Sequence, residues 1–251
     1  MPFPLAHPAA VLPLRRYCPR RLNFPALVIG SLSPDVAYAF GRLHLDRFSH
    51  RFIGSLGFCL PVGLLLLLLF YLGRGFVVQY LPARHRRIFE PLCRGPAGSP
   101  FLIAISVLIG AWTHVFLDAL THGNGWFVEH LSFLQAQVTV GNHQARVCDL
   151  LYAACTFLGA AWVASAYLNW LERAAGNSGW VFPGFKWIST LVVATVTLLL
   201  SFGSRGAFPS LGLFALGILT VILVILFLAV TGWGLRNARR PQPGGSRLPS
   251  G

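Results

Sequence analysis

The sequence predicts an all-α fold: a polytopic membrane helix bundle of about six membrane segments. Apolar runs of about twenty residues recur along the chain, which is the length a helix needs to cross about 30 Å of hydrocarbon. The composition is 55% hydrophobic and only 11% charged, whereas soluble domains carry about 25% charged residues. We therefore expect one integral membrane domain over residues 1–235, followed by a basic, Pro- and Gly-rich, disordered tail over residues 236–251.

The positive charge is distributed in a way that suits a membrane surface. Lys and Arg number 20 against 7 Asp and Glu, for a net charge of +13, and most of these cations lie at the ends of apolar runs. Such positions favour anionic headgroups and control of topology. The chain has no signature of a nucleic-acid-binding motif, so we expect membrane lipids as partners and no nucleic acid. The five cysteines include no C-x-x-C pair, which argues against a disulfide framework.

The N-terminal region is apolar but broken. Four prolines within residues 1–14 exclude a long helix there. This stretch carries His7, and a histidine before a proline is more often a turn or interface residue than a ligand.

Residues 24–41 form a weaker apolar segment, which either crosses the membrane or re-enters it. Asp35, after Ser33 and Pro34, is costly in such a run and is a candidate ligand, unless the segment is interfacial and the carboxylate faces water. A signal peptide ending near Ala39 is a third possibility. The interrupted apolar core and the late position of the basic residues disfavour it.

Five further spans are expected from length and composition: residues 52–72, 101–121, 147–170, 187–202 and 208–233. We expect a basic loop over residues 73–100. A polar stretch follows over residues 123–146, with a short interfacial helix near residues 127–135. If residues 24–41 also cross, 15 of the 20 Lys and Arg fall on the side of both termini. That excess predicts cytoplasmic termini.

The segment WTHVFLDALTH, residues 112–122, carries the most informative polar residues. A helix places His114, Asp118 and His122 within an arc of roughly 80° on one face. Stacked imidazole and carboxylate groups can chelate a divalent metal, and ionisable groups within a membrane-length run are functional candidates by default. The alternatives are a backbone hydrogen bond for His114, an arginine partner for Asp118 and a helix C-terminus for His122.

Other candidates lie at the segment boundaries. His50 immediately precedes the 52–72 span and can reach the membrane boundary. In the predicted topology it lies on the same outer side as Asp35 and Asp118. Glu129 could complete a metal site, although exposed loop carboxylates are usually only solvated.

Several blocks in the same order resemble a known family. They are MPFPLAHPAAVLPLRR, LVIGSLSPDVAY, SHRFIGSLG before LPVGLLLLLL, and GAWTHVFLDALTHGNGWFV. Together they resemble bacterial membrane proteins classified as domain of unknown function 4184, over Met1 to Trp126.

The layout is also similar to that of inner-membrane metal-dependent hydrolases. These have an early His, a Gly-x-x-x-PD block, an H-R-x-x-T-H-S motif and a later H-x-x-x-D helix. The motif here, HRFIGSLG, lacks the second histidine and so offers one ligand fewer. The resemblance implies bacterial inner-membrane localisation and five candidate ligands of a divalent metal such as zinc: His7, Asp35, His50, His114 and Asp118.

These observations lead to a functional hypothesis with two rivals. A metal-dependent hydrolase would use the ion to activate water and polarise the scissile oxygen, with Glu129 or His122 as general base. A lipid or lipid-linked ester or phosphoester is the expected substrate, because the candidates approach the outer interface. The rivals are a small transporter or ion pathway using Asp35 and Asp118, and a structural protein whose polar groups only lock helices together.

Overall fold

The computed structural model describes residues 4–39, 43–141, 143–174, 188–193 and 195–196. Three of its helical segments are long and apolar enough to cross a membrane: Phe52–Gln79, Pro100–His130 and Val147–Ala174. They correspond to the predicted spans over residues 52–72, 101–121 and 147–170. The predicted tail and the 208–233 span lie outside the described residues, as does most of the 187–202 span.

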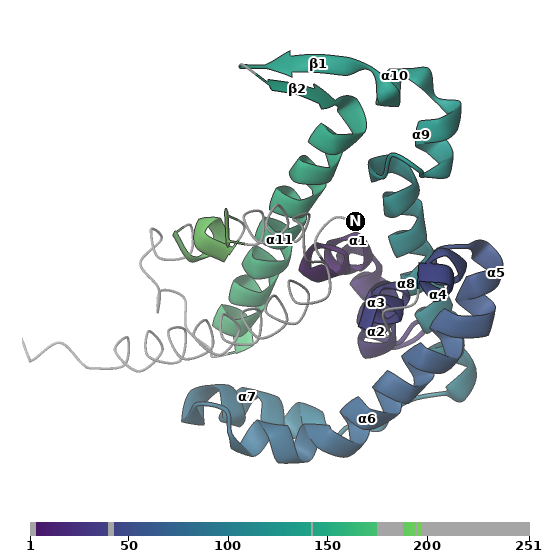
Figure 1. The fold of residues 1–251 in the computed structure, drawn as a ribbon. Helices are drawn as coiled ribbons and strands as arrows, with labels where there is room; N and C mark the ends of the chain where they lie inside the picture. The colour runs from purple at the N-terminus through teal and green to yellow at the C-terminus, as the bar shows by residue number, and fades with distance from the viewer. Residues whose placement is uncertain (1–3, 40–42, 142, 175–187, 194, 197–251) are drawn as a thin grey trace, which may run out of the picture.

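The described chain is mostly helical (Figure 1). In chain order its helices are η1 (Pro4–Ala6), α1 (Pro8–Val11), η2 (Leu12–Tyr17), α2 (Phe24–Leu32), η3 (Ser33–Asp35), α3 (Val36–Ala39), α4 (Leu43–Ser49), α5 (Phe52–Gly54), η4 (Ser55–Cys59), α6 (Leu60–Gln79), α7 (Ala83–Cys93), α8 (Pro100–Thr121), α9 (Trp126–His130), α10 (Ser132–Gln135) and α11 (Val147–Ala174). Strands β1 (Gln137–Val140) and β2 (His143–Arg146) form one antiparallel hairpin.

The segment over residues 24–41 contains no single helix of spanning length in its described part. Asn23 starts α2 by accepting a hydrogen bond from the Ala26 amide at 2.9 Å, and the helix has nine residues. Nine residues rise about 14 Å, half the thickness of the hydrocarbon layer. The prediction placed Pro34 and Asp35 inside this run. In the structure they form the short η3 turn, which separates α2 from α3.

Small residues bring α2 and α8 into close contact. A Cβ atom added to Gly30 would overlap the backbone of Val107, and one added to Gly110 would overlap the Leu27 carbonyl oxygen. Backbones approach this closely only where the interface lacks large side chains. Because α8 carries His114 and α2 ends beside Asp35, this crossing sets the distance between them.

Substitution of Gly110 by alanine should therefore destabilise the protein. The added methyl group meets backbone atoms that cannot move aside, and overpacking costs about 1–3 kcal/mol. We expect a lower midpoint of thermal unfolding in detergent. Gly75→Ala is the matched control, because an added Cβ there has no neighbour within 4 Å. Equal midpoints for the two variants would contradict the close crossing.

The loop before α6 is held to the start of that helix. The π-helical turn η4 widens the helix at its beginning, and such turns occur frequently at functional sites. Cys59 donates its thiol hydrogen to the Ser49 carbonyl oxygen, with 3.3 Å between sulfur and oxygen. The chain around Ser49 is thereby fixed against the helix that η4 and α6 form.

The N-terminal segment lies between α8 and α11 (Figure 1). It contacts α2, α8 and α11, and Ala6 lies where a Cβ atom on Gly159 of α11 would touch it. His7 is completely buried. The prolines shape this segment as short turns, and it folds back beside α8 and α11.

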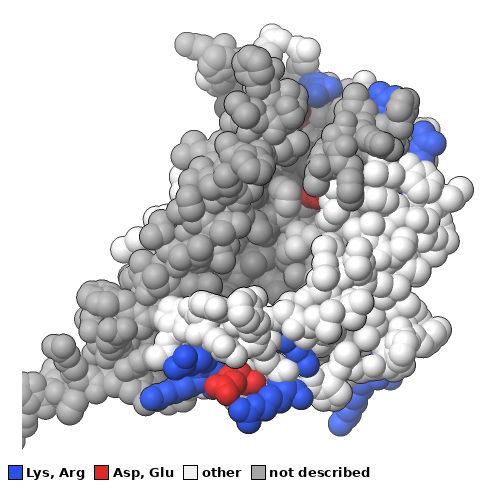
Figure 2. All heavy atoms as spheres, turned by 60° about the horizontal axis from the view of Figure 1, so that its bottom comes forward, with Lys and Arg blue, Asp and Glu red and all other residues white. Residues whose placement is uncertain are grey.

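The basic loop predicted over residues 73–100 is largely helical, which corrects that part of the prediction. The helix α6 continues to Gln79, and α7 follows after Pro82. Figure 2 shows Lys and Arg side chains around an acidic patch at the lower edge of the molecule, where α6 and α7 lie in Figure 1. Arg94 pairs with Glu90 there at 2.8 Å.

The polar stretch over residues 123–146 contains an unpredicted β-hairpin after the expected short helix, which the structure divides into α9 and α10. The segment QVTV alternates β-branched residues with polar ones. Gly141 follows it with a φ of +61°, a conformation that glycine adopts readily in a two-residue turn. The alternating pattern of QVTV, followed by Gly141, was the sequence signal that could have predicted this hairpin. The five cysteines are free in the structure.

Candidate metal centre

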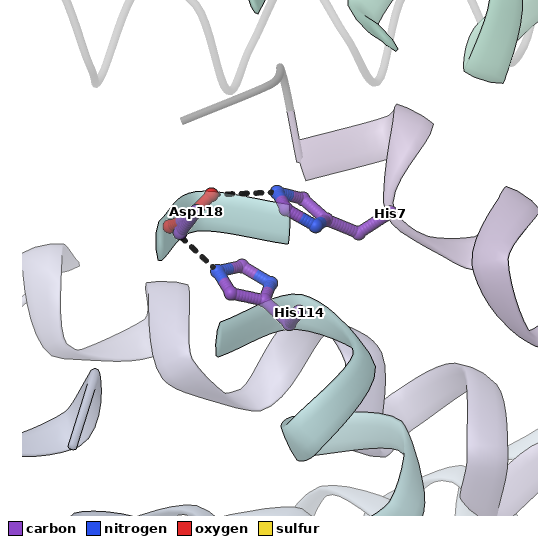
Figure 3. Close-up of side chains that lie close together, drawn as sticks. All are labelled: His7, His114 and Asp118. Carbon is purple, nitrogen blue, oxygen red and sulfur yellow. Dashed lines mark ion pairs between the residues drawn. The ribbon is translucent and has the colours of Figure 1, made fainter. Parts of the chain in front are cut away.

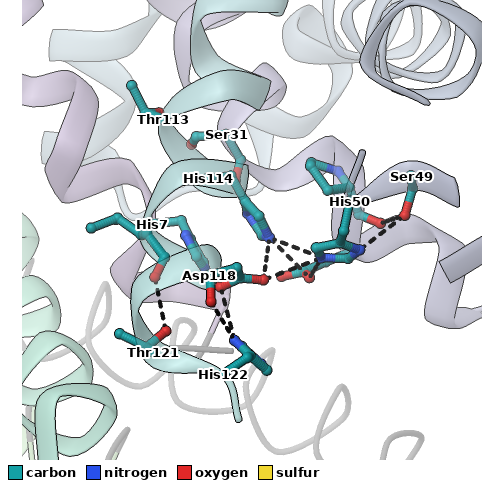
Figure 4. Close-up of polar contacts among 12 residues, drawn as sticks. His7, Ser31, Ser49, His50, Thr113, His114, Asp118, Thr121 and His122 are labelled. Carbon is teal, nitrogen blue, oxygen red and sulfur yellow. Dashed lines mark hydrogen bonds and ion pairs between the residues drawn. The ribbon is translucent and has the colours of Figure 1, made fainter. Parts of the chain in front are cut away.

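Five ionisable side chains from four separate stretches meet beside the C-terminal half of α8. Figure 4 labels four of them, and the fifth is Asp35. His7 lies between η1 and α1, Asp35 ends η3, and His50 follows α4. His114 and Asp118 lie one turn apart on α8. These are the five residues that the resemblance implied as metal ligands.

The ring of His114 has a defined orientation. Its Nδ1 lies 2.8 Å from the carbonyl oxygen of Ser31, and because a carbonyl only accepts hydrogen bonds, Nδ1 carries the proton. Its Nε2 lies 3.4 Å from Asp35 Oδ1 and 3.3 Å from Asp118 Oδ2. In the neutral ring this nitrogen presents its lone pair to the cluster, which is the form that binds metal.

His50 is oriented in the same way by a hydroxyl group. Ser49 donates its hydroxyl hydrogen to the Pro34 carbonyl oxygen at 3.1 Å. The oxygen can therefore accept from Nδ1 of His50, which lies 3.1 Å away. This leaves Nε2 of His50 facing Asp118 Oδ2 at 3.2 Å and Asp35 Oδ1 at 3.7 Å.

The two ring nitrogens face each other across the cluster. Nε2 of His50 lies 3.3 Å from Nε2 of His114. At most one of them can hold a proton in that contact, since two N–H groups would collide. A single shared proton leaves the charge of the Asp35 and Asp118 carboxylates incompletely balanced. A divalent cation between the four groups satisfies both lone pairs and both carboxylates.

The distances fit such an ion. Five of the six separations among Asp35 Oδ1, His50 Nε2, His114 Nε2 and Asp118 Oδ2 are 3.2–3.7 Å. A tetrahedral site with metal–ligand bonds of 2.0–2.1 Å has edges of about 3.3–3.4 Å. Mixed imidazole and carboxylate donors suit zinc and neighbouring first-row ions.

Burial strengthens this requirement for a cation. Within the described residues all four carboxylate oxygens of Asp35 and Asp118 are buried, and none accepts a hydrogen bond of regular geometry. Three of them lie 3.2–3.8 Å from imidazole nitrogens. Buried carboxylates are normally paired or bound to metal, because desolvation without compensation is costly. The donor set therefore fits a metal centre.

His7 joins the cluster from the other end of the chain (Figure 3). Its ring stacks on that of His114 with centroids 3.6 Å apart and an angle of 15° between planes. Its Nε2 lies 3.7 Å from Asp118 Oδ1. Burial lowers the pKa of His7 to about 3, so the ring is neutral at physiological pH and able to bind metal. The sequence alone did not decide whether His7 lies with the other candidate ligands.

The two predicted general bases lie differently. His122, the residue after α8, is partly exposed at the edge of the cluster. Its Nδ1 lies 3.1 Å from the Asp118 carbonyl oxygen and 3.8 Å from Oδ1. Glu129 is exposed on α9 and makes no close contact with the cluster in the described part of the chain. The structure thus brings His122 to the edge of the cluster and leaves Glu129 away from it.

Two groups that orient the histidine rings, the Ser31 carbonyl and the Ser49 hydroxyl, were not predicted from the sequence. Ser49 directly precedes His50, and that adjacency was its only signal. Ser31 acts through its backbone carbonyl, and because every residue has one, the sequence gives no signal for this role. Metal-binding histidines commonly donate their other ring N–H to such groups, which fixes the ring.

Comparison with known proteins identifies the family. No curated protein and no solved structure matches the chain. A family model described as domain of unknown function DUF4184 matches residues 1–234. The match covers most of the chain and includes all five clustered residues. The chain therefore belongs to the DUF4184 family.

Proposed function

We propose that this protein is a membrane-embedded, metal-dependent hydrolase. Its substrate is a lipid or lipid-linked ester or phosphoester at the outer interface of the bacterial inner membrane. Both termini lie in the cytoplasm in this proposal, which requires the short helices of residues 24–41 to cross the membrane together.

One observation supports this function above the others. Two imidazole lone pairs and two buried carboxylates converge at separations that match the edges of a metal coordination shell. A purely structural cluster would be expected to pair each carboxylate with a hydrogen-bond donor, as buried polar groups usually do. Convergence of acceptors on one point favours a bound cation.

Each side chain has a distinct part in the proposed reaction. A bound divalent ion supplies Lewis-acid polarisation and activation of water. Ser31 and Ser49 hold His114 and His50 with their Nε2 atoms directed inward. His122 is the general base in this scheme, because its partly exposed ring lies where the cluster meets solvent. Glu129 is the second candidate for proton transfer and would require movement of α9.

The surroundings of the site support a lipid substrate. Aromatic side chains near the end of α8 remain strongly exposed: Phe116 54%, Trp126 60% and Phe133 61%. Aromatic residues are enriched at the boundary between hydrocarbon and headgroups. An ester or phosphoester bond just below a lipid headgroup would lie at the same level.

The test is metal content together with hydrolysis. Protein purified in detergent should contain metal and should cleave a lipid phosphoester or ester presented in mixed micelles. His114→Ala should lose both properties. His130→Ala is the matched control, because His130 is exposed on α9 and bonds the Trp126 carbonyl oxygen at 2.8 Å, outside the cluster. Metal-free, folded wild-type protein would refute the proposal, and metal without hydrolysis would favour the transport or structural alternatives.

A further inference from the structure

We infer that the centre binds two cations, bridged by the carboxylate of Asp118. One is held by Asp118 Oδ2 with Asp35, His50 and His114. The other is held by Asp118 Oδ1 with His7, and His122 borders its open side. This inference rests on the proposed function and narrows its substrate class.

The two oxygens of Asp118 face different histidines. Oδ2 lies 3.2 Å from His50 Nε2 and 3.3 Å from His114 Nε2. Oδ1 lies 3.7 Å from His7 Nε2 and 3.8 Å from His122 Nδ1. Nδ1 of His122 faces the Asp118 carbonyl oxygen and therefore carries its proton, so His122 is not a ligand. Asp118 thus presents Oδ2 to His50 and His114 and Oδ1 to His7, as a bridging carboxylate does (Figures 3 and 4).

The potential ligands form two groups that overlap at one residue. His7, His114 and Asp118 lie close enough to hold an ion, and so do Asp35, His50 and His114. However, the Nδ1 atom of His114 contacts the Ser31 carbonyl oxygen. Only Nε2 of His114 remains available, and one nitrogen lone pair binds one ion. His114 serves the ion shared with His50, which leaves His7 for a second position.

Ring stacking keeps His7 away from the first ion. The lone pair of an imidazole lies in the plane of its ring, so a bound ion lies in or near that plane. The planes of His7 and His114 are nearly parallel, with centroids 3.6 Å apart. An ion in the His114 plane is thus displaced from the His7 plane by roughly the stacking distance. Paired catalytic ions are about 3.5–4 Å apart.

A pair of ions at this spacing suits the hydrolysis of a phosphoester. Two ions at this spacing stabilise both the attacking and the leaving oxygen of an in-line displacement at phosphorus. In the proposed hydrolysis the water oxygen forms a bond to phosphorus, and the bond from phosphorus to the alcohol oxygen breaks. One proton of the water passes to the departing alcohol, and the other product is the phosphate acid. A phosphoester lipid is the substrate class that follows.

Metal stoichiometry and electron paramagnetic resonance test the second position. Wild-type protein loaded with Mn²⁺ should bind two ions and show the signal of an exchange-coupled pair. His7→Ala and His7→Gln should bind one ion and show an isolated Mn²⁺ signal, with unchanged elution in gel filtration. The glutamine variant keeps more of the side-chain volume than alanine does, so it separates loss of a ligand from loss of packing. The control His130→Ala should keep both ions.

The outcomes separate the two proposals. One ion in the wild type, with no change in either His7 variant, would overturn the two-ion centre and leave the metal hydrolase standing. No bound ion in folded wild-type protein would overturn both. Loss of every ion in both His7 variants would place His7 in a single shared site, which also contradicts the inference.

Discussion

Replacement of Asp118 by asparagine is expected to reduce metal affinity by more than about 100-fold. The amide keeps the size of the side chain but removes the charge and replaces one acceptor oxygen with an N–H donor. That change directs hydrogens toward imidazole lone pairs 3.2–3.3 Å away. Loss of a group that only orients a ligand already costs about 10- to 100-fold, so loss of a direct ligand should cost more.

Titration of purified protein with Zn²⁺ against a competing chelator measures this effect. The control is Glu90→Gln, which makes the same acid-to-amide change at an exposed residue of α7 paired with Arg94. Its affinity should equal that of the wild type. Unfolding by heat, followed for each variant, shows whether Asp118→Asn remains folded. A folded asparagine variant with wild-type affinity would exclude Asp118 as a ligand.

Removal of the metal should lower the stability of the wild-type protein. A ligand at 100 times its dissociation constant stabilises the folded state by about 2.7 kcal/mol, and about 1 kcal/mol shifts the midpoint by roughly 2–4 °C at this chain length. We therefore expect chelation to lower the midpoint of thermal unfolding by about 5–10 °C. The buried carboxylates of Asp35 and Asp118 would then lack their compensating charge.

His114→Ala provides the control for chelation. Chelation should lower the unfolding midpoint of this variant by much less than that of the wild type, because the ion that His114 holds is already absent. Readdition of Zn²⁺ should restore the midpoint of the wild type alone. A wild-type protein that contains metal but shows no response to its removal would show that the ion contributes nothing to the fold.

The part of the site on one helix could be predicted from the sequence. A spacing of four residues places His114, Asp118 and His122 on the same face regardless of the surrounding fold. The structure brings both histidines within 4 Å of the Asp118 carboxylate. Asp35 and His50 were expected on the same side from the distribution of charge, and they also lie in the cluster.

The position of His7 required the three-dimensional structure. If every segment either crosses the membrane or stays outside it, the number of crossings places His7 on the opposite side of the membrane from the other candidates. The short turns around His7 neither cross the membrane nor stay apart from the candidate spans. The helix α2 is too short to cross as a single regular helix. Gly30 and Gly110 allow α2 and α8 to pack closely enough for this arrangement of short helices. No periodicity in the sequence predicts that contact.

The participation of His7 also bears on how the protein is made. His7 leaves the ribosome long before Asp118, yet the two side chains end within 3.7 Å of each other. The nascent N-terminal segment must therefore wait, without its partners, until the helix carrying Asp118 has entered the bilayer. Capture of a cation by both residues would close a loop of more than a hundred residues.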